Sequence, residues 1–82
     1  MVTAELVGKI LREYRMGKHM SQELLSGLAG LDRTHYSKIE RGLRNPTIDT
    51  LFKIAAALDT APSDIIKRIE HAVKESESNR GE

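Results

Sequence analysis

The sequence predicts an all-α protein, a compact bundle of five helices. Three observations support this prediction. Apolar residues recur every three or four positions in five segments, each segment is bounded by residues that start or stop helices, and no segment shows the strict alternation of a β-strand. The 82 residues are enough for one domain with one small core. The chain has no cysteine, which excludes a disulfide framework and a thiolate metal site.

Glycines and capping residues bound the first two predicted helices. The first covers about residues 4–16 and is ended by Gly17. The second starts at Ser21, a good N-cap, and is stopped by Gly30. We expect both helices to bury one apolar face, which comprises Leu6, Val7, Ile10, Leu11, Tyr14, Leu24, Leu25 and Leu28.

The next two predicted helices follow short polar segments. Asp32 caps a helix over about residues 33–41, which stops at Gly42. Thr47 caps the fourth helix, directly after Pro46. The core-facing residues of these two helices are expected to be Tyr36, Ile39, Ile48, Leu51, Ile54, Ala55 and Leu58.

The fifth predicted helix begins at Pro62, because proline suits the first helical position, and it runs to about Lys74. The remaining segment, ESESNRGE, contains no apolar residue. We therefore expect a helical domain over residues 1–74 and a disordered tail over residues 75–82.

Positive charge is concentrated in the middle of the chain. Residues 1–45 contain eight Lys/Arg and five Asp/Glu, whereas residues 46–82 contain five and seven. The segment 33–44 holds four cations and one acid, namely Arg33, Lys38, Arg41, Arg44 and Glu40. A local basic patch favours binding to a polyanion. An ordinary solvated surface is the alternative if charge is considered alone.

Residues 22–39 carry the spacing of a helix-turn-helix motif. Counted from Gln22, the fifth position is Ser26, whose small side chain lets two helices cross closely, and the ninth is Gly30, which permits a left-handed turn. The apolar positions of the motif are occupied by Leu25, Ala29, Leu31, Tyr36 and Ile39. A plain helical hairpin, the alternative, needs no small residue and glycine at this spacing.

The segment SQELLSGLAGLDRTHYSKIERGLRNPTIDTLFKIAAAL resembles the phage-repressor-type helix-turn-helix family of bacterial regulators. Within it, LDRT, SKIERG and RNPT resemble the controller proteins that regulate restriction-modification genes. This resemblance implies a lambda-repressor-like DNA-binding domain of five helices. It also implies a transcriptional regulator that binds a palindromic operator as a homodimer, with DNA binding and dimerisation both within residues 1–74.

The start of the third predicted helix is expected to enter the major groove of DNA. Arg33 can present a two-pronged donor to guanine, and Thr34 offers a hydroxyl or a methyl group. Ser37 and Lys38 lie one turn further along the same face, so these four residues are the predicted base contacts. The predicted phosphate contacts are Ser21, Gln22, His35, Tyr36, Arg41, Arg44 and Asn45.

Two further sets of residues are assigned structural roles. The family pattern pairs Glu40 with the arginine that ends the first helix, Arg15, so the resemblance implies a structural ion pair instead of an acid catalyst. The fifth helix carries more apolar residues than one interior face requires. We predict that Ile65, Ile66 and Ile69 contribute to a two-fold interface. The alternative is that all three belong to the core.

Double-stranded DNA and a second copy of the chain are thus the expected partners. RNA polymerase is a candidate third partner, through an activator patch for which Glu40, Asp49 and Lys53 are candidates. The alternative function is an antitoxin or another protein-interaction module, which would co-purify with its partner.

No carboxylate pair, nucleophile–base set or metal-ligand spacing is present, so we expect no enzyme, metal or cofactor. No apolar run is long enough for a membrane helix, and a cytoplasmic location is expected.

Overall fold

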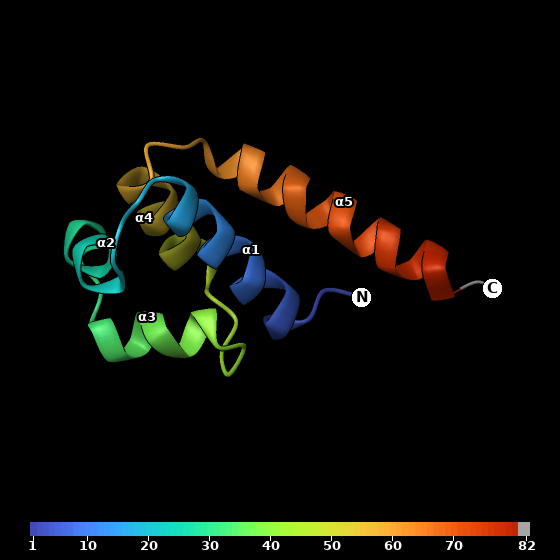
Figure 1. Ribbon diagram of the computed structural model, residues 1–82, viewed down its shortest axis with the longest axis horizontal. Helices are drawn as coiled ribbons and strands as arrows, with labels where there is room; N and C mark the ends of the chain where they lie inside the picture. Colours follow the sequence, from blue (N-terminus) through green and yellow to red (C-terminus); the bar gives the residue numbers. More distant parts are fainter. Residues whose placement is uncertain (81–82) are drawn as a thin grey trace.

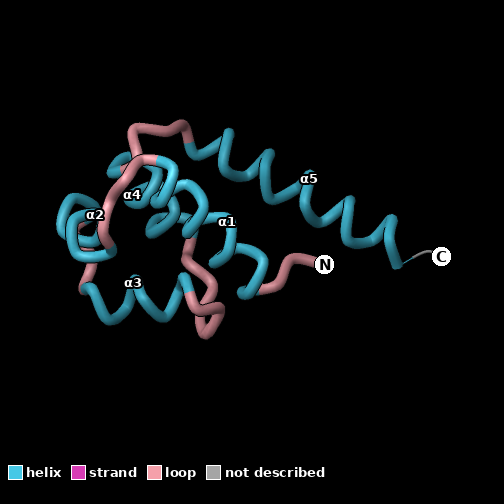
Figure 2. The backbone as a smooth tube through the Cα atoms, in the orientation of Figure 1, coloured by secondary structure: helices cyan, strands magenta, loops and turns pink. Residues whose placement is uncertain are grey.

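A computed structural model describes residues 1–80, which form five helices and no strand (Figures 1 and 2). The helices are α1 (Ala4–Gly17), α2 (Gln22–Ala29), α3 (Arg33–Glu40), α4 (Ile48–Ala57) and α5 (Pro62–Arg80). The predicted all-α fold is therefore confirmed. In the part of the chain that the structure describes, no helix combines the length and apolar character needed to cross a membrane.

Side-chain caps fix where the first four helices begin. Ser21 Oγ accepts a hydrogen bond from the Leu24 amide, and Asp32 accepts one from the His35 amide. Thr47 caps α4 in the same way, and Thr3 caps α1, a cap that the sequence analysis did not identify. Each cap satisfies one of the backbone N–H groups that a helix start leaves without a partner. The caps predicted at Ser21, Asp32 and Thr47 are confirmed.

The helices enclose one core. α1 contacts α3 and α5, α2 contacts α3 and α4, and α4 also contacts α5. α1 and α3 approach closely at Gly8, where an added Cβ would meet the backbone of Ile39 and Glu40. The core residues are Val7, Ile10, Leu11, Leu25, Tyr36, Ile39, Leu51, Ile54, Ala55, Leu58, Ile65 and Ile69.

Three residues predicted to face the core are instead exposed. Leu28 and Ile48 are 62% and 69% exposed, and Leu24 is also exposed. On α2, the buried residues are Leu25, Ser26 and Ala29. Leu24 directly precedes Leu25 and Leu28 directly precedes Ala29, so each lies about 100° around the helix from its buried neighbour. Ile48 occupies the first position of α4, one turn before the buried Leu51. The apolar stripe of each helix is therefore wider than the face that packs.

The fifth helix continues beyond its predicted end near Lys74 and reaches Arg80. The prediction of disorder is wrong for residues 75–80, and residues 81–82 lie outside the described part of the chain. Extension of an existing helix needs no apolar residue, because each added residue gains a backbone hydrogen bond without a new nucleation step. Polar side chains four residues apart also meet along this part of α5, as in the Glu70–Lys74 pair at 3.7 Å and the His71–Glu75 contact at 3.4 Å. As a result α5 projects past the other helices (Figure 1).

Candidate nucleic-acid interface

The turn between α2 and α3 has the geometry that the sequence predicts. Gly30 adopts a left-handed conformation with φ of 69°, and the Leu31 amide donates to the Ser26 carbonyl oxygen at 2.8 Å. The Ser26 side chain is buried, and its hydroxyl donates to the Glu23 carbonyl oxygen. Because the residue at this position is small, α2 and α3 pack closely, and the start of α3 is held at a fixed place on the surface.

The exposed part of α3 is its start. Arg33 and Thr34 are exposed, whereas Ser37 and Lys38, one turn later, are half-buried. Residues four apart on a helix lie one above the other, so Arg33 and Ser37 form one row, and Thr34 and Lys38 form the next. The structure therefore brings the four predicted base-contacting residues together on one stretch of α3.

The cations around α3 differ in their partners from Lys53, Arg68 and Lys74, three cations of α4 and α5. Within residues 1–80, no carboxylate forms an ion pair with Arg33, Lys38, Arg41 or Arg44. By contrast, Lys53 pairs with Asp49, Arg68 with Glu13 and Lys74 with Glu70. Unpaired cations on one surface leave positive charge available to an external anion.

Behind this surface, the Glu40 carboxylate accepts four hydrogen bonds. Arg15 donates twice, from Nε to Oε2 at 2.6 Å and from Nη2 to Oε1 at 3.0 Å. Gln22 Nε2 donates to Oε1 at 3.0 Å, and the Tyr36 hydroxyl donates to Oε2 at 2.5 Å. The ion pair predicted between Arg15 and Glu40 is present, and the side chains of the pair are only 13% and 3% exposed.

The ionisation of this cluster follows from its surroundings. Burial acts to raise the pKa of Glu40, but the hydrogen bonds from Arg15, Tyr36 and Gln22 together outweigh it and lower that pKa. The hydrogen bond to Glu40 raises the pKa of Arg15. Burial, followed by the hydrogen bond to the Glu40 carboxylate, raises the pKa of Tyr36 far above its ordinary value. The cluster is thus a carboxylate held by one cation and two neutral donors at neutral pH.

The predicted phosphate contact of Tyr36 is wrong. Its side chain is completely buried and its hydroxyl is used by Glu40, so it cannot reach a phosphate on the surface. A tyrosine at this core position needs a partner for its hydroxyl, and the sequence did not show that Glu40, one turn later, provides it. Gln22 is half-buried, with its amide nitrogen engaged by the same carboxylate.

The remaining predicted phosphate contacts lie at the surface. Ser21 is exposed at the start of α2, and His35 is half-buried on α3. Arg41, Arg44 and Asn45 are exposed in the segment that joins α3 to α4. Their contacts with DNA remain predictions.

The predicted activator patch loses one of its three residues. The side chain of Glu40 is buried, so it cannot contact RNA polymerase at the surface. Asp49 and Lys53 are exposed and form an ion pair at 3.3 Å.

The predicted dimer contacts separate into two groups. Ile65 and Ile69 are buried in the core of the chain itself, so their assignment to an interface is wrong. Adjacent residues on a helix point about 100° apart, and only Ile66, at 45% exposed, faces outward. Sequence reasoning missed two exposed apolar residues on α4, Ile48 and Phe52. Their spacing of four residues is a signal for a shared face.

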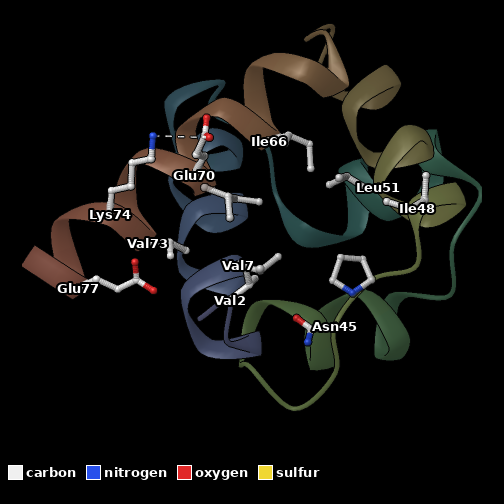
Figure 3. Close-up of a pocket in the computed structure, with 12 residues that line it drawn as sticks. Val2, Val7, Asn45, Ile48, Leu51, Ile66, Glu70, Val73, Lys74 and Glu77 are labelled. Carbon is white, nitrogen blue, oxygen red and sulfur yellow. Dashed lines mark ion pairs between the residues drawn. The ribbon is translucent and has the colours of Figure 1, made fainter.

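Ile66 lies where two grooves meet. One, of about 590 Å³, lies between α5, the start of α1 and the start of α4, and Figure 3 shows Ile66, Ile48 and Val73 around it. The other is lined in part by Phe52, Pro62 and Ile66. The two grooves form a continuous, largely apolar surface along α4 and α5. No cluster of three or more His, Asp or Glu side chains within the described residues could hold a metal ion.

Comparisons with known proteins agree with this geometry. A helix-turn-helix family model matches residues 11–65. The chain is 44% identical over 62 residues to the control protein C.BamHI of Bacillus amyloliquefaciens, covering 74% of this chain and 76% of that protein. It is 38% identical over 64 residues to the control protein C.SmaI of Serratia marcescens, covering 78% and 76%.

Solved structures of controller proteins have the same fold. The restriction-modification controller protein C.AhdI of Aeromonas hydrophila has a TM-score of 0.73 and 42% sequence identity, covering 76% of this chain and 94% of that one. The controller protein C.Esp1396I, solved as a tetramer in complex with its natural 35 base-pair operator, has a TM-score of 0.76 and 32% identity, covering 83% and 90%. The chain therefore belongs to the helix-turn-helix family, and its relatives in that family include controller proteins of restriction-modification systems.

Proposed function

We propose that this chain is a sequence-specific DNA-binding transcriptional regulator that acts as a homodimer on a pseudo-palindromic operator, as a controller protein of a restriction-modification system. The observation that carries the proposal is the start of α3, where Arg33 and Thr34 are exposed and polar and Arg33 forms no ion pair with the described carboxylates. It stands on a helix-turn-helix scaffold whose relative C.Esp1396I was solved on its operator.

In the proposed complex, α3 lies in the major groove and its first two turns read bases. The guanidinium of Arg33 donates two parallel hydrogen bonds to O6 and N7 of a guanine. Thr34 contacts a base through its hydroxyl or a thymine through its methyl group, and Ser37 and Lys38 read the following base pairs. Each of these contacts can discriminate among bases because the edges exposed in the major groove differ for every base pair.

Phosphate contacts hold α3 in register. Ser21 stands at the N-terminus of α2, where free backbone N–H groups and the helix dipole favour an anion. Arg41, Arg44 and Asn45 extend the contact beyond the other end of α3, and His35 adds a contact at its side. These contacts carry no sequence information, but they supply the salt-dependent part of the affinity.

A homodimer doubles the number of bases read. We place its two-fold interface on Ile66, Ile48 and Phe52, the exposed apolar residues along α4 and α5. Two recognition helices must then lie about 34 Å apart, one turn of DNA. Because DNA is the proposed target, we infer a cytoplasmic location. If it also activates transcription, Asp49 and Lys53 are the exposed charges on α4 available to RNA polymerase.

Selection of bound sequences from a random DNA pool tests this proposal. The expected result is a two-fold symmetric consensus. Arg33→Ala should then weaken binding to the selected sequence by about 1–3 kcal/mol and relax the preference at one base of each half-site. Arg68→Ala is the matched control, because Arg68 is on α5 and pairs with Glu13 of α1. No enriched sequence, or equal binding by the wild type and the Arg33 variant, would contradict the proposal.

A further inference from the structure

The hydrogen bond between Gln22 and Glu40 joins the two far ends of the helix-turn-helix. Gln22 is the first residue of α2 and Glu40 is the last residue of α3. The Gly30 turn connects the other two ends of these helices. Two short rigid helices that share a turn at one end have an angle set by the separation of their other ends. Gln22 Nε2 and Glu40 Oε1, 3.0 Å apart, define that separation through one direct contact.

The Gln22–Glu40 contact can fix the separation of the two helix ends only if the Glu40 carboxylate itself cannot rotate. Oε1 accepts from Arg15 and Gln22, and Oε2 accepts from Arg15 and Tyr36. Each oxygen thus has two donors, which come from α1, α2 and α3. The third hydrogen bond from Arg15, from Nη1 to the Met20 carbonyl oxygen at 2.7 Å, holds the guanidinium against the segment that leads into α2. Rotation of the carboxylate would break several hydrogen bonds at once.

The geometry points to Gln22 and Tyr36 as positioning residues for DNA recognition: through Glu40 they fix the angle between α2 and α3, and with it the placement of Ser37 and Lys38 in the groove. This inference rests on the proposed function for its DNA measurements. It differs from the phosphate contact predicted for Gln22 and gives the buried hydroxyl of Tyr36 a role in DNA recognition. Neither residue needs to touch a base.

The length of α3 gives the size of the effect. Eight residues of helix span about 12 Å, so a shift of about 1 Å at the Gln22–Glu40 contact rotates α3 by about 5°. Lys38 lies five residues from Arg33, about 7 Å along the axis, so it moves by about half an ångström relative to the start of the helix. A base-specific hydrogen bond is sensitive to a displacement of this size, whereas a flexible side chain on a phosphate can follow it.

The experiment compares Gln22→Met, Tyr36→Phe and a matched control, Tyr14→Phe, in the full-length chain. Tyr14 is a half-buried tyrosine of α1 whose hydroxyl has no hydrogen-bond partner among the described residues. Affinities for the selected operator and for unrelated duplex DNA are measured over a series of salt concentrations. Residual dipolar couplings measured without DNA give the angle between α2 and α3.

For Gln22→Met and Tyr36→Phe, we expect operator affinity to fall about fivefold or more, the cost of one mismatched base pair. Affinity for unrelated DNA and the slope of affinity against salt should stay at the wild-type values, and the angle between α2 and α3 should change. Tyr14→Phe should alter none of these quantities.

Two results would overturn the inference. If Gln22→Met lowers both affinities equally and reduces the salt slope by about one, Gln22 acts as a phosphate contact. If both variants keep the wild-type helix angle and operator preference, the network has no positioning role. Absence of operator preference in the wild type would contradict the proposed function instead, and the helix angle would then decide the positioning role by itself.

Discussion

The guanidinium of Arg15 and the carboxylate of Glu40 meet through two parallel hydrogen bonds, at 2.6 and 3.0 Å, in the interior of the fold. The pair joins the last turn of α1 to the last residue of α3. Two charges removed from water are stable together only while each satisfies the other. The orientation of the recognition helix therefore depends on a contact that neither helix provides alone.

Replacing Glu40 by Gln should lower the free energy of unfolding by about 3 kcal/mol at neutral pH, because Arg15 would remain buried without its counter-charge. Urea unfolding followed by circular dichroism measures the change. Glu13→Gln is the matched control, since Glu13 also pairs with an arginine of another helix, but at the surface and at 3.6 Å. That variant should change stability by less than about 1 kcal/mol. If the two variants lose the same free energy of unfolding, the buried Arg15–Glu40 pair stabilises the fold no more than the surface Glu13–Arg68 pair does.

Glu40→Gln also tests how the free energy of unfolding depends on pH in the acid range. The hydrogen bonds of the network lower the pKa of Glu40 below its ordinary value of 4.5, despite the opposing effect of burial. The stabilisation that results is complete above pH 4.5, where the unfolded carboxyl is ionised, and is lost as the pH falls through the folded-state pKa. The excess stability of the wild type over Glu40→Gln should thus be constant above that pH and shrink below it. A constant difference down to acid pH would contradict this prediction.

Tyr36→Phe tests how the free energy of unfolding depends on pH in the alkaline range. Burial, and next the hydrogen bond to Glu40, raise the pKa of Tyr36 above its ordinary value of 10.0. The neutral hydroxyl is thus favoured in the folded state, and its contribution to stability is present below pH 10 and lost as the pH rises above it. Unfolding curves from pH 8 to about pH 11 should show the wild type losing its advantage over Tyr36→Phe. Parallel curves would contradict the assignment.

Gly8→Ala should destabilise the protein by about 1–3 kcal/mol, the typical cost of overpacking. The new Cβ would lie 2.5 Å from the Glu40 carbonyl oxygen, and backbone atoms cannot move aside as a flexible side chain can. Gly27→Ala is the control, because a Cβ at Gly27 in α2 meets nothing within 4 Å. The control should be more stable than the wild type by about 0.5–1 kcal/mol, since alanine favours a helix. Thermal unfolding of both variants measures the two changes in stability, and a Gly8→Ala variant as stable as Gly27→Ala would contradict the prediction.

Local signals made most of the fold predictable. Ser21, Asp32 and Thr47 act on amides only three residues away, and Gly30 acts on its own backbone, so their roles depend on neighbours in the sequence. The motif spacing placed α2 and α3 correctly for the same reason. The Arg15–Glu40 pair joins residues 25 positions apart, and it was found only through the family resemblance.

The errors arose where packing between helices decides the outcome. The sequence shows that Leu24, Leu28 and Ile48 are apolar, but the width of the packed face depends on neighbouring helices. Ile65 and Ile66 are alike in sequence, and only the position of α5 against the core buries the first and exposes the second. The hydroxyl of Tyr36 has its partner inside the molecule because the Glu40 carboxylate, which also accepts from Arg15, lies one turn later on the same helix.

The exposure of Ile66 leads to a test of the dimer. Ile66→Asp places a charge on the apolar surface shared by the two grooves of α4 and α5, where an interface would have to desolvate it. Sedimentation at micromolar concentrations should show a monomer, with operator affinity reduced because each monomer reads one half-site. Leu28→Asp is the matched control: Leu28 is 62% exposed against 45% for Ile66, but it lies on α2, outside both grooves. That variant should remain dimeric. If Leu28→Asp dissociates and Ile66→Asp does not, the two-fold interface lies on α2 instead.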